Sequence, residues 1–332
     1  MNKKFKSGII ILIVMIIVVL AALFGTYFIS GTNDSHPVVP DSNYNYKNYD
    51  PQVAKEYKNL YIASVYLEGT IEESNTTYNQ NWILSTIESL KNDPKNAALA
   101  LYINSPGGAV YQADEVYLSL LEYKNSGKQI YVYQGPMAAS GGYYISCAAN
   151  EIWANRNTLT GSIGVISGTS IDVSDLLANL GIKSETIHSG KNKNMGNYNE
   201  PLTDEQREIL QQIGDECYEQ FCSIVVANRH ISFNDIYKIA DGRVYTATQA
   251  KNLGLIDHIG SYEEMLNSFS YAIGKPGIKV VEMKYEPAWN FSSWFNNITT
   301  SIFNKTTSIK TGIPESVLES QSFNSYPAYI LK

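Results

Sequence analysis

Short hydrophobic runs alternate with amphipathic stretches through most of the chain. β-rich runs predict strands at residues 61–66, 97–103, 129–134, 151–154, 183–188, 255–259 and 278–283, with a glycine-punctuated turn leading into another strand at 158–166. Apolar residues at helical spacing predict helices at 81–91, 110–124, 141–149, 173–180, 203–229, 233–239, 246–253 and 261–272. Residues 97–103 are almost continuously apolar, as expected for a strand buried on both faces. Strands that alternate with helices predict an α/β domain with a mostly parallel sheet.

The N-terminal pattern is of another kind. Lys3, Lys4 and Lys6 precede an uncharged apolar run at 8–29, which is long enough to span a bilayer. A cleaved signal peptide is the competing reading, but the run is long and ends without a clear small-x-small site. The basic flank predicts a cytoplasmic N-terminus.

The chain therefore divides into five predicted parts. They are a cytoplasmic segment at 1–7, a transmembrane helix at 8–29, a linker at 30–57, a folded domain at 58–285 and a C-terminal arm or tail at 286–332.

Composition narrows the class of protein. A net charge of -7 without a basic stripe argues against a nucleic-acid partner. Three cysteines, Cys147, Cys217 and Cys222, form neither a disulfide framework nor a metal cluster, so we expect buried core residues, no metal site and no cofactor.

Ser140 is the first candidate for chemistry. It lies between a predicted strand and a predicted helix, with two alanines before it and Gly141 and Gly142 after it. A serine at such a junction is held by a tight turn near unpaired backbone N–H groups, which suits a nucleophile. The N–H of Gly141 would point towards a developing oxyanion. A simple serine helix cap is, however, far commoner, and this motif alone does not decide between the two.

A second glycine turn, at Gly107 and Gly108, also joins a buried strand to a helix. In a parallel sheet, both turns lie at the carboxyl ends of strands, so they can meet there. The second turn could then supply another oxyanion donor. A Pro-Gly turn with no catalytic role would have the same sequence pattern.

A nucleophilic serine needs a base. Of four histidines, His36 lies in the linker and His230 and His258 lie at element ends. His188 is followed by a loop with Lys191 and Lys193, so either a histidine or a lysine with a lowered pKa could serve. Solvated surface lysines are the ordinary content of such a loop.

Five motifs in order resemble the signal peptide peptidase A (SppA) family, peptidase family S49, in its short Bacillus-type form. They are residues 103–108 (INSPGG), 137–144 (MAASGGYY), 160–165 (TGSIGV), 189–193 (SGKNK) and 240–245 (ADGRVY). Each motif alone is weak, but their order is specific. The resemblance covers about residues 61–272 and implies a ClpP/crotonase-like fold with repeated β-β-α units and a Ser–Lys dyad peptidase at 58–285.

The resemblance also assigns roles. Ser140 matches the nucleophile, and Lys193 matches the general base that closes a Ser-Gly-x-x-Lys pattern. Gly107 matches the oxyanion glycine, next to Gly108, with the Gly141 N–H as the second donor. Ser162 matches a serine that orients the lysine. Asn194 departs from the family, which commonly has an acidic residue after the lysine.

The resemblance further implies a membrane-anchored, extracytoplasmic peptidase that degrades remnant signal peptides and forms a ring-shaped homo-oligomer. Three alternatives remain open. The first is a membrane-protein quality-control peptidase with the same dyad, and the second is a non-catalytic crotonase-like scaffold that binds peptides. The third, a cytoplasmic CoA-binding enzyme, rests on the fold alone and disagrees with the anchor.

Overall fold

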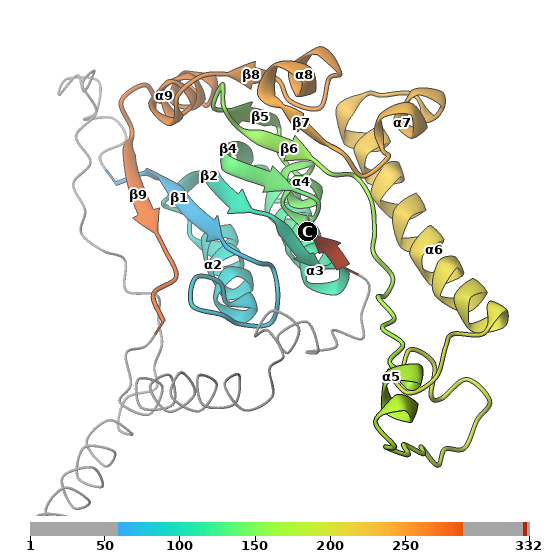
Figure 1. Cartoon of the computed structure of the whole chain (residues 1–332). Helices are drawn as coiled ribbons and strands as arrows, with labels where there is room; N and C mark the ends of the chain where they lie inside the picture. The colour runs from blue at the N-terminus through green and yellow to red at the C-terminus, as the bar shows by residue number, and fades with distance from the viewer. Residues whose placement is uncertain (1–58, 288–327, 331–332) are drawn as a thin grey trace, which may run out of the picture. The chain divides into compact units, whose positions relative to one another are not determined.

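A computed structural model describes residues 59–287 and 328–330 of the chain (Figure 1). The predicted cytoplasmic segment, transmembrane helix and linker lie outside these residues, as does most of the predicted tail. Within the described ranges, no helix has both the length and the apolar character needed to cross a membrane.

A mostly parallel sheet forms the centre of the fold, as the alternating pattern predicts. Its strands are β1 (Tyr61–Glu68), β2 (Asn96–Ser105), β4 (Gln129–Ala139), β5 (Glu151–Ala154), β6 (Leu159–Gly161), β7 (Val244–Thr246), β8 (His258–Ile259) and β9 (Lys279–Met283). The strand order is β7-β6-β4-β2-β1-β9, and β5 pairs with both β4 and β8. Only the β6–β7 pair in this sheet is antiparallel.

Two further strands, β3 (Gly107–Ala109) and β10 (Ala328–Ile330), form a separate antiparallel pair. Strand β3 is not predicted by the hydrophobic pattern, because it has only three residues.

The helices cover both faces of the sheet (Figure 1). They are α2 (Gln80–Asn92), α3 (Val110–Asn125), α4 (Gly141–Ser146), α5 (Ser174–Asn179), α6 (Asp204–Arg229), α7 (Phe233–Ile239), α8 (Ala247–Asn252) and α9 (Tyr262–Ala272). Leu99 and Leu101 of β2 belong to the core cluster under α2, α3 and α4, whereas Ala98 and Ala100 belong to the cluster under α9. The prediction that this strand is buried on both faces is therefore confirmed.

Side-chain hydrogen bonds hold both ends of helix α6. The predicted cap is present: the Gln206 N–H donates to the Thr203 hydroxyl at 3.2 Å, and the Thr203 N–H donates to the Gln206 side chain at 3.1 Å. At its other end, Arg229 donates both of its terminal NH groups to the carboxylate of Asp257, at 2.8 and 3.0 Å. This bidentate pair fastens the C-terminal end of α6 to the strand region of the domain.

One predicted strand is wrong. Residues 183–188 form no strand, because no neighbouring strand is there to pair with them, although the β-branched Thr186 and Ile187 favour one locally. They belong to residues 168–202, here called the outer segment, which includes α5. None of the residues of α5 is buried, and residues 178–191 are all exposed. Figure 1 shows α5 and the following loop beside the N-terminal end of α6, away from the sheet.

Candidate active site

Ser140 has an unusual backbone. It follows β4 directly, is 1% exposed, and has φ 53° and ψ -115°. Such a positive φ is strained for a residue with a Cβ, and strain of this kind concentrates at functional sites. Although Ser140 occupies the cap position of α4, its side chain makes no capping hydrogen bond. The helix-cap reading therefore loses its physical basis, and the Ser140 hydroxyl is left for another use.

The predicted meeting of the two glycine turns is confirmed. A Cβ placed on Gly141 would lie 3.3 Å from the backbone N of Gly108. The turns are brought together because β2 pairs with β4, with Ser105 opposite Ala138. Gly108 is also essential for packing, since a Cβ there would lie 1.9 Å from the carbonyl oxygen of Ile71.

Gly107 has a different local role from Gly108. Its φ is 105°, which favours glycine, and its N–H donates to the hydroxyl of Ser105 at 3.1 Å. The N–H of Gly107 therefore has a partner within its own turn, whereas the backbone N of Gly108 lies next to the Ser140 turn.

Ser162 lies beside Ser140. The short β6 pairs with the end of β4, with Gly161 opposite Ala139, and the Ser140 N–H donates to the Gly161 carbonyl at 2.8 Å. Ser162 also has a positive φ, of 52°, and is 6% exposed. Its N–H donates to the carbonyl of Arg243 at 2.8 Å. The 240–245 motif thus holds the Ser162 turn in place through the backbone, while the Arg243 side chain pairs with Asp241 of the same turn.

Lys193 lies apart from these residues. It is exposed, on the outer segment, and its N–H donates to the carbonyl of Gly190 at 3.1 Å. The loop is tied to the start of α6, because Lys191 forms an ion pair with Glu205. Across residues 59–287, no hydrogen bond or ion pair joins Lys193 to Ser140 or Ser162. One chain therefore assembles the serine, the glycine turns and Ser162, but does not bring the lysine to them.

Asn194, the departure from the family pattern, is buried at 7% exposure. Its side-chain NH₂ donates to the carboxylate of Glu200 at 2.6 Å, and its side-chain oxygen accepts from Asn197 at 2.7 Å. An amide can donate and accept at once, so Asn194 braces the loop that carries Lys193.

The alternative bases do not reach Ser140 either. His188 is exposed, and its Nδ1 lies 3.1 Å from the Gly190 carbonyl. His230 ends α6, and His258 stacks on Trp153 at 4.4 Å, so both lie at element ends as predicted. Burial lowers the pKa of Lys124, but its amine donates to the carbonyls of Ala148 and Ala149, beyond the C-terminal end of α4.

The cysteines are unsuited to nucleophilic chemistry. Burial raises the pKa of Cys147 to about 12 and that of Cys222 to about 11, so neither thiol ionises near neutral pH. Cys217 is half-buried, and burial raises the pKa of its thiol as well. In the described part of the chain, no group of three or more His, Cys, Asp or Glu side chains could hold a metal ion.

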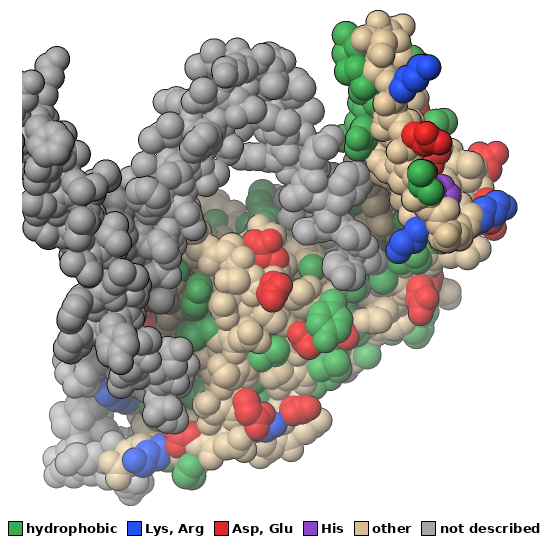
Figure 2. Space-filling view, turned by 90° about the horizontal axis from the view of Figure 1, so that it is seen from below, with side chains coloured by type: hydrophobic (Ala, Val, Ile, Leu, Met, Phe, Trp, Pro, Cys, Tyr) green, Lys and Arg blue, Asp and Glu red, His purple; other side chains and the backbone are tan. Residues whose placement is uncertain are grey.

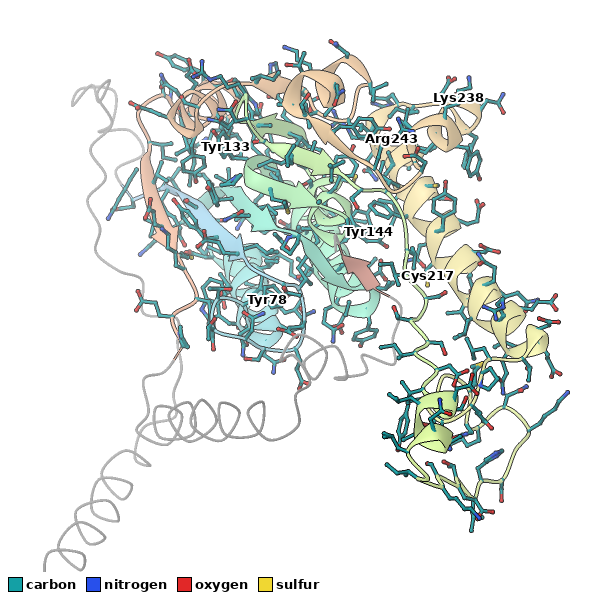
Figure 3. The ribbon with its side chains drawn as sticks, viewed as in Figure 1. Tyr78, Tyr133, Tyr144, Cys217, Lys238 and Arg243 are labelled. Atoms are coloured by element: carbon teal, nitrogen blue, oxygen red, sulfur yellow. The ribbon has the colours of Figure 1, made fainter. Side chains whose placement is uncertain are left out.

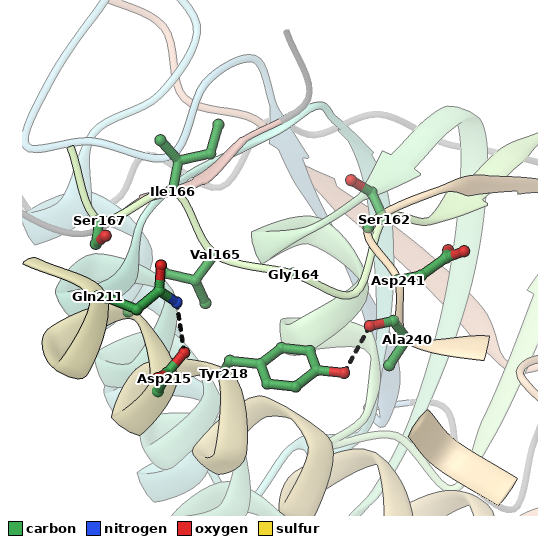
Figure 4. Close-up of a pocket in the computed structure, with 12 residues that line it drawn as sticks. Ser162, Gly164, Val165, Ile166, Ser167, Gln211, Asp215, Tyr218, Ala240 and Asp241 are labelled. Atoms are coloured by element: carbon green, nitrogen blue, oxygen red, sulfur yellow. Dashed lines mark hydrogen bonds between the residues drawn. The ribbon is translucent and has the colours of Figure 1, made fainter. Parts of the chain in front are cut away.

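A cavity of about 480 Å³ opens beside Ser162 (Figure 4). One wall is the extended chain at 164–167, and the other walls are α6 and the turn at 240–242. The Tyr218 hydroxyl donates to the Ala240 carbonyl at 2.7 Å and so closes one side. The sequence does not reveal this cavity, because its walls come from three distant segments.

Strand β10, near the C-terminus, lies against the glycine turn. It pairs antiparallel with β3, with Tyr329 opposite Gly108 and Ile330 opposite Gly107. An extended segment of chain therefore fits along β3, beside the Ser140 turn.

Comparison with known proteins finds similar sequences among peptidases. The sequence model of peptidase family S49 matches residues 122–273. "Putative signal peptide peptidase SppA" of Enterococcus faecium is 33% identical over 224 residues, 68% of this chain and 65% of its own length. "Protease 4" of Salmonella typhi is 34% identical over 206 residues, 61% of this chain and 33% of its own length.

The matched residues include Ser140, Ser162 and Lys193. The chain is similar to SppA-type members of peptidase family S49, but spans less than two thirds of the length of either relative.

Proposed function

We propose that this protein is a serine peptidase with Ser140 as its nucleophile and Lys193 as its general base. The observation that carries the proposal is the strained, buried backbone of Ser140, whose hydroxyl caps no helix and whose turn adjoins Gly108. The mixed α/β fold with its parallel-rich sheet fits a ClpP/crotonase-like peptidase domain.

The reaction follows from these groups. The unprotonated amine of Lys193 takes the proton of the Ser140 hydroxyl as Ser140 Oγ attacks a peptide carbonyl. The tetrahedral oxyanion accepts hydrogen bonds from the N–H groups of Gly108 and Gly141. We place the first donor at Gly108 because the N–H of Gly107 is bound to Ser105. Lys193 protonates the leaving amine, and water, deprotonated by the same amine, releases the acyl group.

The base reaches Ser140 from a neighbouring copy of the chain. Lys193 is exposed on the outer segment and is not held against its own Ser140. Ser162, next to Ser140, is placed to receive the incoming amine. Each copy then supplies a lysine to the next and receives one itself. Such a head-to-tail contact produces a ring when the rotation closes.

Exposed apolar side chains on the outer segment support this contact. Leu176, Leu180, Ile182 and Ile187 are 58%, 65%, 52% and 94% exposed. Figure 2 shows hydrophobic side chains interspersed with basic and acidic ones on this part of the molecule. Apolar side chains gathered this way mark interaction sites, and a second copy would bury them.

Peptide substrates bind along β3 in this proposal. The antiparallel pairing of β10 with β3 has the geometry of an added strand, in which main-chain hydrogen bonds hold the peptide and side-chain pockets select it. The substrates are small or apolar at the cleaved bond, as in remnant signal peptides. The apolar run at 8–29 anchors the peptidase domain at the outer face of the membrane.

The same geometry predicts that the C-terminus is itself a substrate. We expect intact-mass spectrometry to find the wild-type chain shorter at its C-terminus than the Ser140→Ala variant, because β10 lies beside Ser140. Identical C-termini in the two proteins would refute self-trimming.

A fluorophosphonate probe tests the function directly. The wild-type protein should be labelled and should cleave fluorogenic peptides, whereas Ser140→Ala should do neither, because the probe reacts only with an activated serine. Cys147→Ala is the matched control, since it truncates another small buried side chain directly after α4, outside the proposed site, and should remain labelled. A correctly assembled wild-type protein that is neither labelled nor active would instead be a peptide-binding scaffold.

A quality-control peptidase with the same dyad is the second candidate. Its substrates would be damaged membrane proteins, and the apolar anchor at 8–29 fits this role equally well. Profiling cleavage of signal peptides against loops of membrane proteins separates the two functions.

A further inference from the structure

The hydroxyl of Tyr144 joins three helices at one buried point. It donates to the carboxylate of Asp114 on α3 at 2.5 Å and accepts from the side-chain NH₂ of Gln220 on α6 at 2.7 Å. Tyr144 itself lies on α4, where its N–H donates to the Ser140 carbonyl at 2.8 Å. Its side chain is completely buried. Figure 3 shows Tyr144 within the domain, on the side nearest α6.

Each of these helices leads to a different part of the proposed site. Helix α3 follows β3 and its oxyanion turn without a break, and α4 begins at Gly141 directly after the nucleophile. Helix α6 is joined at its N-terminal end to the outer segment, which carries Lys193. Tyr144 is thus a point where the supports of the oxyanion turn and the nucleophile meet the helix that leads to the lysine this copy supplies to its neighbour.

We infer that Tyr144 is a positioning residue for the peptidase reaction. This inference rests on the proposed function. Tyr144 holds α4 in a fixed orientation between α3 and α6, so that Gly141 and Gly108 face the same point. It touches no reacting atom.

The packing around the ring explains why the hydroxyl decides this orientation. The ring of Tyr144 contacts Tyr117 edge-on at 5.4 Å and Phe221 at 5.1 Å between centroids. These contacts fix the position of the ring and leave the hydroxyl to connect two polar partners. Without the Tyr144 hydroxyl, Asp114 and Gln220 lose their shared hydrogen-bond partner. The six-residue α4 can then shift against α3 and α6. A shift of about 1 Å at a reacting group can lower a rate by about a hundredfold.

Tyr143 provides a matched control. It precedes Tyr144 on the same helix and is equally buried, and its hydroxyl donates to the Leu255 carbonyl at 2.9 Å. That carbonyl lies after α8, in no element that bears a site residue. Tyr143→Phe and Tyr144→Phe therefore make the same chemical change at neighbouring positions.

The experiment measures kcat, KM, the rate of fluorophosphonate labelling and the thermal midpoint of both variants in the full-length protein. Tyr143→Phe should lower the midpoint by about 2–4 °C, as expected for a lost buried hydrogen bond, and Tyr144→Phe, which loses hydrogen bonds to both Asp114 and Gln220, should lower it further, by about 4–8 °C. Tyr144→Phe should lower kcat and the labelling rate by roughly ten- to a hundredfold with KM within about twofold, whereas Tyr143→Phe should leave all three within about twofold.

Asp114 adds a rescue test, because Asp114→Asn keeps an oxygen that accepts from Tyr144 and Asp114→Ala does not. The asparagine variant should retain most of the wild-type kcat, and the alanine variant should resemble Tyr144→Phe. Equal kcat values for Tyr143→Phe and Tyr144→Phe would overturn the positioning role while leaving the peptidase intact. A wild-type protein that is neither labelled nor active would overturn the proposed function, and the positioning role with it.

Discussion

Replacing Lys193 with alanine is expected to lower peptide cleavage by about a hundredfold to ten-thousandfold, the usual contribution of a general acid–base group. The serine, the glycine turns and Ser162 stay in place in this variant, because none of them contacts Lys193 within the described chain. Folding should therefore be unchanged, and only the removal of the Ser140 proton should fail. Hydrolysis of a fluorogenic peptide, measured beside a circular dichroism melt, checks both points.

Lys191 supplies the matched control for this prediction. It lies on the same loop, is highly exposed, and pairs with Glu205 at the start of α6. An exposed ion pair contributes little to stability, so Lys191→Ala should keep cleavage within about twofold of the wild type. Retained activity in Lys193→Ala together with lost activity in His188→Ala would show that the base is a histidine and that the dyad is wrongly assigned.

Two inactive variants are expected to restore each other's activity when they assemble together. A Lys193→Ala copy still holds Ser140, and a Ser140→Ala copy still offers Lys193 on its outer segment. Where the first receives the outer segment of the second, a complete site forms. Random mixing of equal amounts should regenerate about a quarter of the wild-type sites, because each copy occupies the required position half of the time. Coexpression followed by a peptide cleavage assay measures this.

The control for the mixing experiment pairs Lys193→Ala with a double variant, Ser140→Ala and Lys193→Ala together. That mixture contains Ser140 but no Lys193, so it should stay inactive. Activity that fails to return in the first mixture, although the two proteins are shown to co-assemble, would mean that both dyad residues come from one chain.

Much of the site can be predicted from the sequence because its pieces are local. Ser140 stands between a β-rich run and a pair of glycines, and such a turn places it at the carboxyl edge of a parallel sheet. The glycine turn after β2 has the same layout, so the meeting of the two turns also follows. The capping box of α6 is equally local and is found as predicted.

Other features depend on contacts that no local pattern encodes. Strand β4 pairs with β5 along its first half and with β6 at its end, and this exchange of partners places Ser162 beside Ser140. Residues 183–188 illustrate the opposite failure, because their β propensity finds no strand to pair with. The separation of Lys193 from Ser140 is likewise a property of the fold, because the loop that carries Lys193 belongs to the outer segment and not to the sheet.

Ser140 and Ser162 both have a positive φ, which glycine adopts freely and other residues adopt at a cost. Each such residue costs of order 1–3 kcal/mol, a noticeable part of the roughly 5–15 kcal/mol by which a domain is stable. Glycine at either position would relax the chain and remove the hydroxyl. A substitution that raises thermal stability at either serine would therefore remove a group that the proposed reaction needs. Stabilising substitutions in this protein are better placed at sites remote from these two serines.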